Sequence, residues 1–163
     1  MAHAKKTKDE DDGIKIICRN KRAFHEYIVF EALECGVVLT GTEVKSLRAG
    51  NASLEDAYAK LDESSELWLI GSDIPEYMEG NRFNHKPKRP RKLLLHKREI
   101  SKFAGKATQK GFTLIPLRLY FKQGLAKVEI AVAKGKQMHD KRQASKKADA
   151  EREIRRAMTR RNR

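Results

Sequence analysis

The sequence predicts a mainly β protein: an antiparallel OB-like β-barrel of about six strands, with two or three short helices and a basic C-terminal tail. Three observations predict it. Short apolar segments, alternating or rich in β-branched and aromatic residues, recur from residue 14 to residue 133 between turn residues. No strand–helix–strand alternation and no internal repeat accompanies them. Hydrophobic residues make up 39% of the chain, enough for one core. Closing the sheet into a barrel removes exposed strand edges.

The first expected elements follow a polar segment, residues 1–13, which we expect to be a disordered arm. Asn20 is a favourable N-cap for a short helical turn. Gly36 is expected to break a run of β-branched and aromatic residues. The expected order is a strand at Ile14–Cys18, a turn at Lys21–His25, and strands at Tyr27–Glu34 and Val37–Leu39.

A helix and a hairpin are expected next. Val44 and Leu47 share a helix face, Thr42 is the expected N-cap, and Gly50 suits the position after the helix end. The polar residues 62–65 (DESS) predict a hairpin turn. The expected order is a helix at Glu43–Gly50 and strands at Ser53–Leu61 and Glu66–Ile70.

The following segment contains three of the chain's four prolines. Because Pro87 and Pro90 lie among cations, we expect a long surface loop rather than a packed strand. Ile100 and Phe103 share a face of an expected helix, and residues 122–124 (KQG) predict a hairpin turn. The expected order is the loop Pro75–Lys92, a strand at Leu93–Leu95, a helix at Lys97–Gln109, and strands at Thr113–Phe121 and Leu125–Ala133.

The last 30 residues differ from the expected barrel, which we place at residues 14–133. Residues 134–163 contain good helix formers and a thin apolar stripe that includes Ile154 and Met158. This stripe is too narrow to dock firmly on the barrel. We therefore expect a tail that is disordered alone and helical when bound to a polyanion.

Charge is the strongest functional signal. The chain has 36 Lys and Arg against 22 Asp and Glu, a net charge of +14. Positive charge is concentrated in residues 82–110 and in residues 134–163, whereas residues 14–81 are net negative. A charge of this size favours binding to polyanions, of which RNA, DNA and anionic membranes are the candidates.

Several function classes are disfavoured. The five histidines show no metal-ligand or nucleophile spacing, and Cys18 and Cys35 alone cannot form a zinc site, so we expect no enzymatic activity, no metal and no cofactor. The start of the chain lacks the apolar region of a signal peptide, and no apolar run approaches the roughly 20 residues that span a bilayer. We expect a cytoplasmic protein with reduced cysteines and no membrane partner.

Cations next to aromatic rings suit single-stranded or loop RNA, because cations bind phosphates and rings stack on bases. One such group is Lys21, Arg22 and His25 with Phe24 and Tyr27, and another is Arg82 and Phe83 ahead of the basic residues Arg89, Arg91 and Lys92. The remaining aromatic residues are expected in the core: Phe30, Tyr58, Trp68, Phe103, Phe112, Tyr120 and Phe121.

Five sequence blocks occur in the order found in one family: NKRAFHEY (Asn20–Tyr27), LECGVVLTG (Leu33–Gly41), GTEVKSLRAG (Gly41–Gly50), RKLLLHKREI (Arg91–Ile100) and AKGKQMHDKR (Ala133–Arg142). On these blocks the chain resembles the SmpB family, the SsrA-binding proteins that partner transfer-messenger RNA (tmRNA). The resemblance implies a six-stranded antiparallel OB-like barrel with three helices. It also implies an RNA face containing Asn20, Lys21, Glu34, Leu94 and Lys127.

The resemblance further implies a role in ribosome rescue. The barrel would bind the tRNA-like domain of tmRNA and deliver it to stalled ribosomes for trans-translation, as a monomer. The tail would enter the decoding centre and the empty mRNA channel, against 16S rRNA. The residues expected there are Lys134, Gly135, Lys136, His139, Asp140, Lys141, Arg142, Ile154 and Met158. The alternative is a general single-stranded RNA-binding or ribosome-associated OB-fold protein, which would not prefer tmRNA over unrelated RNA.

Overall fold

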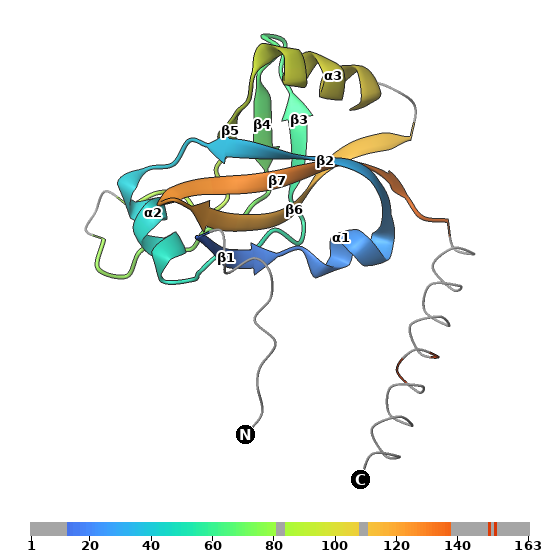
Figure 1. Cartoon of the computed structure of the whole chain (residues 1–163). Coiled ribbons are helices and arrows are strands. Elements are labelled where there is room, and N and C mark those ends of the chain that lie inside the picture. The colour runs from blue at the N-terminus through green and yellow to red at the C-terminus, as the bar shows by residue number, and fades with distance from the viewer. Residues whose placement is uncertain (1–12, 81–83, 108–110, 138–149, 151, 153–163) are drawn as a thin grey trace.

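The computed structural model describes residues 13–80, 84–107, 111–137, 150 and 152, and its secondary structure is mainly β (Figure 1). The strands are β1 (Ile14–Arg19), β2 (Tyr27–Val37), β3 (Tyr58–Leu61), β4 (Leu67–Ile70), β5 (Arg91–Leu94), β6 (Phe112–Lys122) and β7 (Leu125–Gly135). The helices are α1 (Lys21–Glu26), α2 (Gly41–Arg48) and α3 (Lys97–Ala107). The predicted mainly β antiparallel fold is confirmed. The described residues form seven strands, where about six were expected, and three helices, where two or three were expected.

The strands form one antiparallel sheet that closes on itself. Six strands pair in the cyclic order β6, β3, β4, β5, β2 and β7, and the pairing of β7 with β6 completes the ring. The seventh strand, β1, pairs with the second half of β6. A single ladder pair, Ala59 with Leu114, joins β3 to β6. Closure gives each of these six strands a partner strand on both sides, although β5 meets β2 only at Gly36 and Val37. Removing exposed strand edges was the physical reason for expecting a barrel.

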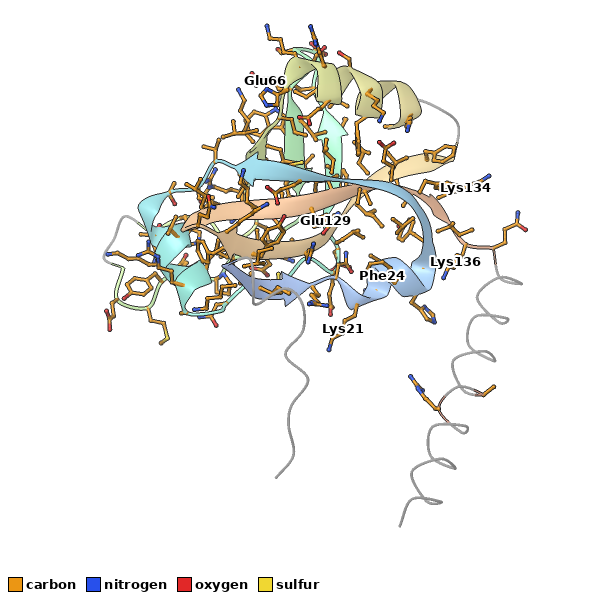
Figure 2. The ribbon with its side chains drawn as sticks, in the orientation of Figure 1. Lys21, Phe24, Glu66, Glu129, Lys134 and Lys136 are labelled. Atoms are coloured by element: carbon orange, nitrogen blue, oxygen red, sulfur yellow. The ribbon has the colours of Figure 1, made fainter. Side chains whose placement is uncertain are left out.

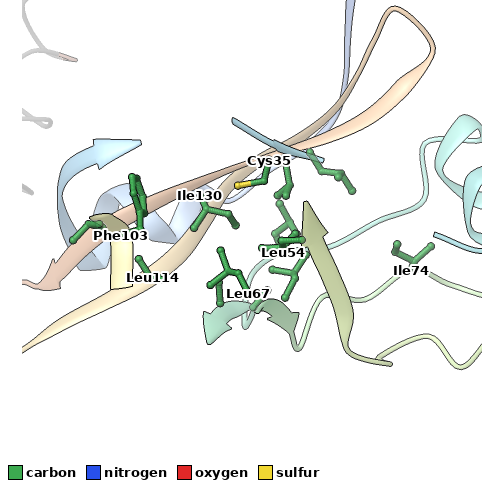
Figure 3. Packing of buried hydrophobic residues seen from close by; sticks show 14 of the residues in the cluster. Cys35, Leu54, Leu67, Ile74, Phe103, Leu114 and Ile130 are labelled. Carbon is green, nitrogen blue, oxygen red and sulfur yellow. The ribbon is translucent and has the colours of Figure 1, made fainter. Parts of the chain in front are cut away.

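The barrel interior holds the main hydrophobic core (Figure 3). Alternate residues of β6 and β7 point inward, and Phe103 of α3 caps the same cluster. A second, smaller cluster lies between α1 and the outer side of β6 and β7, and its buried members are Ala23, Ile115, Leu117, Ala131 and Ala133. Helix α1 is therefore fixed to the outside of the barrel.

The helix caps explain where two helices begin. The side chain of Asn20 accepts a hydrogen bond from the backbone nitrogen of Ala23 at 3.0 Å, which confirms the predicted N-cap. Helix α2 begins two residues earlier than predicted, because Thr40 rather than Thr42 is its N-cap and the Glu43 carboxylate accepts from the Thr40 nitrogen at 2.7 Å. Gly50 follows the C-cap with a φ of 85°, the left-handed conformation that glycine tolerates best.

Several predicted boundaries are wrong. Gly36 does not break β2, which runs unbroken to Val37; a Cβ at this position would lie 3.2 Å from the Cβ of Leu94, so the glycine allows β5 to approach closely. Strand β3 is shorter than the alternation suggested, starting at Tyr58. Strand β7 continues to Gly135, two residues past its predicted end.

The proline-rich segment is not the free surface loop that we predicted. His85 is buried, and its ring bonds to Thr42 Oγ1 and to the carbonyl oxygen of Ile74, both at 2.9 Å. Arg91 is fully buried and opens β5. The segment is held against α2 because Glu43 of that helix pairs with Arg91 at 2.8 Å.

The core assignment of the aromatic residues is right in part. Phe103, Tyr120 and Phe121 are buried. Phe30 and Tyr58 are exposed, so the prediction was wrong for these two. Alternation in sequence shows that residues share a face of a strand, but it does not show which face turns inward.

Candidate RNA-binding surface

The outer face of the barrel carries an in-register row across five strands. Leu94 of β5 pairs with Gly36 of β2, Gly36 with Lys127 of β7, Lys127 with Tyr120 of β6, and Tyr120 with Ile16 of β1. Leu94 is half exposed at one end of the row. The row brings together strands that lie more than 100 residues apart in the chain.

A second row lies beside the first, two residues along β2, β7 and β6, and three residues along β1, whose register shifts between Ile16 and Cys18. Glu34 pairs with Glu129, Glu129 with Arg118, and Arg118 with Arg19. The Arg118 Nε and a Glu129 carboxylate oxygen form an ion pair, and the Arg118 guanidinium lies 5.1 Å from the ring centre of Tyr120. Figure 2 shows Glu129 in the middle of this face. The two rows are called the five-strand face below.

Glu34 is the centre of polar contacts on the five-strand face. Its carboxylate accepts a hydrogen bond from the Tyr120 hydroxyl at 2.5 Å, and the Nζ atoms of Lys122 and Lys127 lie 3.3 Å and 3.9 Å away. The hydrogen bond from Tyr120, opposed by partial burial and aided by the two lysines, lowers the pKa of Glu34. The carboxylate is therefore ionised at neutral pH and holds two cations on the surface.

This arrangement accounts for an acidic residue on a face expected to bind RNA. Burial, together with the hydrogen bond to Glu34, raises the pKa of Tyr120, so its hydroxyl stays a donor. Lys122 and Lys127 keep part of their side chains exposed. Each ammonium has three donors, so bonding to Glu34 leaves donors for an RNA phosphate. Glu34 thus positions cations rather than opposing the RNA by itself.

Three of the five residues implied by the family resemblance meet on the five-strand face: Glu34, Leu94 and Lys127. Asn20 does not lie open to a ligand, because it is 3% exposed. Its amide nitrogen donates to the carbonyls of Leu54 and Pro116, and its oxygen caps α1. The structure therefore gives Asn20 a structural role in fixing α1, which differs from the expected RNA contact.

Helix α1 presents the remaining predicted residues of the N-terminal group. Lys21, Phe24 and His25 are exposed (Figure 2 labels the first two). Arg22 is also exposed but pairs with Glu26 at 3.2 Å and with Asp56 at 3.4 Å. Exposed pairs of this kind are weak, so Arg22 remains available to an anionic ligand.

The basic block before β5 does not present its charge as predicted. Arg91 is buried and donates to Glu43, to both oxygens of Ser72 and to the carbonyl of Pro87, so the prediction that it faces phosphates is wrong. Arg89 pairs with the same carboxylate at 2.5 Å, and Lys92 pairs with Glu66 at 2.5 Å. Burial of Arg91 requires this compensation, because an unpaired buried charge is very unfavourable.

The start of the predicted tail is anchored to α1. Lys134 and Gly135 belong to β7. The backbone nitrogen of Lys136 donates to the Glu26 carbonyl at 2.8 Å, and its Nζ donates to the Phe24 carbonyl at 2.8 Å. The exposed residues of α1 and the start of the tail are therefore neighbours (Figure 2). The other predicted site residues lie outside the described residues: Arg82, Phe83, His139, Asp140, Lys141, Arg142, Ile154 and Met158.

The residues that sequence reasoning did not assign to this surface include Tyr120, Arg118 and Glu129 of the five-strand face, and Lys122 beside it. Tyr120 was assigned to the core, and its ring is indeed buried while its hydroxyl reaches Glu34. The predicted hairpin at residues 122–124 contained the missing signal. Its register places Tyr120 opposite Lys127 without any long-range information.

Other chemistry finds little support in the described part of the chain. Among those residues, no group of three or more His, Cys, Asp or Glu side chains is placed to hold a metal ion. No helix there is both long and apolar enough to span a bilayer. Cys18 and Cys35 are free thiols, and burial raises their pKa values to about 11 and about 12, which makes them poor nucleophiles.

Comparisons with known proteins give a consistent result. The family model described as SmpB protein matches residues 17–160. The SsrA-binding protein of Desulforudis audaxviator is 57% identical over 143 residues, covering 88% of this chain and 93% of that protein. The SsrA-binding protein of Acidothermus cellulolyticus is 56% identical over 151 residues, covering 93% and 94%. A solved structure described as "tmRNA-SmpB: a journey to the center of the bacterial ribosome" is 44% identical, with a TM-score of 0.64, covering 78% of this chain and 93% of that one.

Proposed function

The chain belongs to the SmpB family, and on this premise we propose that it is an adaptor that binds tmRNA and brings it to stalled ribosomes for trans-translation. The barrel binds the tRNA-like domain of tmRNA, and residues 134–163 bind 16S rRNA in the decoding centre and the empty mRNA channel. No catalytic step is required of the chain itself. A protein with this role works in the cytoplasm, where ribosomes translate.

One observation carries the assignment of tmRNA to the five-strand face. An ionised carboxylate, two lysines, a tyrosine hydroxyl and an exposed leucine meet there from four strands. Lysines supply phosphate contacts, and the carboxylate fixes where those charges stand. The exposed Leu94 adds an apolar surface next to them. A folded RNA of fixed shape is better recognised by such a rigid sheet than by a mobile loop.

The tail is assigned to the ribosome on different grounds. Residues 134–163 have a net charge of +8, counted as 12 Lys and Arg minus 4 Asp and Glu, which suits a channel walled by rRNA phosphates. The bonds of Lys136 to the carbonyls of Phe24 and Glu26 hold the chain against α1 where it leaves the barrel, and Lys21 and His25 are exposed on that helix. We assign α1 to the same rRNA surface as the tail because the two are neighbours.

Charge reversal at Lys127 tests the tmRNA-binding face. Lys127→Glu removes one phosphate contact and places a second carboxylate beside Glu34, so the affinity for the isolated tRNA-like domain should fall by about tenfold or more. Fluorescence anisotropy with labelled RNA measures the change. Lys60→Glu is the matched control, because Lys60 is an exposed lysine on β3, away from the five-strand face.

Two outcomes would count against this assignment. Equal losses for Lys127→Glu and Lys60→Glu would mean that only net charge matters. Equal affinity of the native chain for tmRNA and for an equal mass of unrelated RNA would favour a general RNA-binding protein. Binding should also weaken steeply with added salt, because phosphate contacts release counterions.

A further inference from the structure

One exposed aromatic surface has no place in the proposed function. Phe30 of β2 is 58% exposed, and its ring meets Phe112 of β6 edge to face, with ring centres 5.3 Å apart. Ile28 is 41% exposed and pairs with Lys134, which in turn pairs with Phe112. Ile28, Phe30 and Phe112 are called the aromatic patch below. The ring of Phe30 is exposed, whereas Phe112 is half-buried and packs against the main core. Apolar side chains grouped at the surface of a folded domain are typical of a binding surface.

The patch lies where the ends of β2, β6 and β7 extend beyond their pairing with β5 and β3. Strand β5 pairs with β2 only at Gly36 and Val37, and β3 pairs with β6 only at Leu114. Within the described part of the chain, residues 27–33 of β2 therefore pair with β7 on one edge and with no strand on the other. Phe30 is exposed at this end of the sheet, beside α3, whose Lys102 and Lys106 bond to Glu31.

A β-bulge aims Phe30 at the patch. The register of β2 against β7 shifts between Val29 and Glu31, which makes Phe30 the extra residue. Tyr27 and Val29 pack against the α1 cluster, so Ile28 between them points to the opposite side. A bulge re-aims a side chain, and here the exposed ring of Phe30 is turned to the same side as Phe112.

Cations surround the patch. Lys134 lies between Ile28 and Phe112 in the ladder. Lys102 and Lys106 of α3 both bond to Glu31, the residue next to Phe30, and these bonds lower the pKa of Glu31 to about 2. Three lysines against one carboxylate leave the rim net positive. Aromatic rings inside a cationic rim are the combination that holds unpaired nucleobases, by stacking and by phosphate contact.

The positive charge around the aromatic patch also shows which ligand suits it: the C-terminal tail of this chain or a polyanion. The tail of this chain has an apolar stripe, but beyond Lys136 it carries a net charge of +6, counted over residues 137–163 as 10 Lys and Arg minus 4 Asp and Glu. The lysines of the rim would repel it. A polyanion with exposed ring faces suits both the charge and the shape.

The patch is separate from the five-strand face. Lys127 and Lys134 are seven residues apart on β7, about 23 Å at 3.3 Å per residue. An odd spacing on an unbulged strand places them on opposite sides of the sheet. Lys134 is instead two residues before Lys136, where the chain leaves the barrel (Figure 2).

We propose that the aromatic patch stacks on an unpaired base of ribosomal RNA beside the start of the C-terminal tail. This inference rests on the proposed function, because it takes the RNA around the tail to be ribosomal. It adds a specific contact to a binding mode that charge alone would leave non-specific. Phe30 is the central residue of the contact, and the edge-to-face contact with Phe112 holds its ring in place.

Photo-crosslinking tests the inference. The full chain, with p-benzoylphenylalanine at position 30 or at position 136, is bound with tmRNA to bacterial 70S ribosomes stalled on a truncated message. Position 30 should crosslink to 16S rRNA. If position 136 crosslinks to 16S rRNA and position 30 reaches only tmRNA, the chain's own tail or nothing, the inference is wrong while the proposed function stands. If neither position reaches rRNA, the proposed function fails and this inference with it.

Affinity measurements provide the second test. Phe30→Ala should weaken binding to the 30S subunit by about fivefold or more, the lower range for loss of one stacked base, and Phe30→Tyr should retain it. Binding of Phe30→Ala to the tRNA-like domain should stay unchanged. Leu125→Ala is the control, since Leu125 is an exposed apolar residue at the other end of β7. A loss for Leu125→Ala equal to that for Phe30→Ala, or no loss for Phe30→Ala, would overturn the contact.

Discussion

Replacing Glu43 with Gln removes the carboxylate that forms ion pairs with both Arg89 and Arg91. Its oxygens accept hydrogen bonds from Arg89 Nε at 2.8 Å, from Arg89 Nη2 at 2.5 Å, from Arg91 Nε at 2.8 Å and from the Thr40 nitrogen at 2.7 Å. Glu43 and Arg91 are both fully buried, whereas the side chain of Arg89 is partly exposed. After the substitution, water can therefore solvate the charge of Arg89, but it cannot reach the buried charge of Arg91.

The expected cost follows from this difference. Breaking a buried ion pair by removing one partner destabilises a protein by about 3–5 kcal/mol. Typical domains unfold with about 5–15 kcal/mol, so Glu43→Gln should lose a large part of the free energy of unfolding. Urea unfolding followed by circular dichroism measures it. Glu63→Gln, in an exposed turn, is the control and should change stability by about 0.5 kcal/mol or less.

The pH dependence gives the same reasoning a second test. Burial alone would raise the pKa of Glu43, but the bonds from Arg89 and Thr40 and the charge of Arg91 outweigh it, so the pKa is lowered. A lowered pKa means that the stabilisation is present above the unfolded-state pKa, about 4.3, and is lost as the pH falls through the folded value. The difference in the free energy of unfolding between the native chain and Glu43→Gln should become smaller in acid. Two results would refute the reasoning: a loss of less than about 1 kcal/mol in the free energy of unfolding at pH 7, or a difference between the two proteins that grows in acid.

Three further predictions concern the core, a turn and the tail. Alkylation of Cys35 by iodoacetamide at pH 8 should be about 1000-fold slower than that of a free thiol, because burial raises its pKa from 9.0 to about 12; fast labelling without denaturant, read by mass spectrometry, would contradict this. Gly71→Ala should cost about 1–3 kcal/mol in urea unfolding, because φ is 76° and the new Cβ would lie 2.8 Å from the Asp56 carbonyl oxygen; an unchanged midpoint would show that the turn relaxes freely. Deletion of Asp140–Arg163 should leave tmRNA affinity nearly intact and abolish tagging on stalled ribosomes; loss of tmRNA binding would show that the two surfaces are not separate.

The sequence by itself determined the local elements of this protein. Alternation within Leu125–Ala133 identified β7, and Asn20 identified the start of α1, because both signals depend only on neighbours along the chain. The ordered blocks and the concentrated positive charge identified the family and the class of ligand. These features can be read from the sequence because hydrophobic periodicity, helix capping and local charge are properties of short segments.

The tertiary structure alone decided which of the predicted residues meet. Arg91 appeared to be a loop cation, but Glu43, 48 residues away, draws it into the interior. Glu34 appeared unsuited to an RNA face, but Tyr120 and Lys122, 86 and 88 residues away, make it the centre of one. The sequence places Phe30 in the core, but it lies on the part of β2 that extends beyond the pairing with β5, and its ring is exposed there. The physical reason is common to all three: a side chain's surroundings depend on which strands pair and in what register, and a period-two pattern leaves both undetermined.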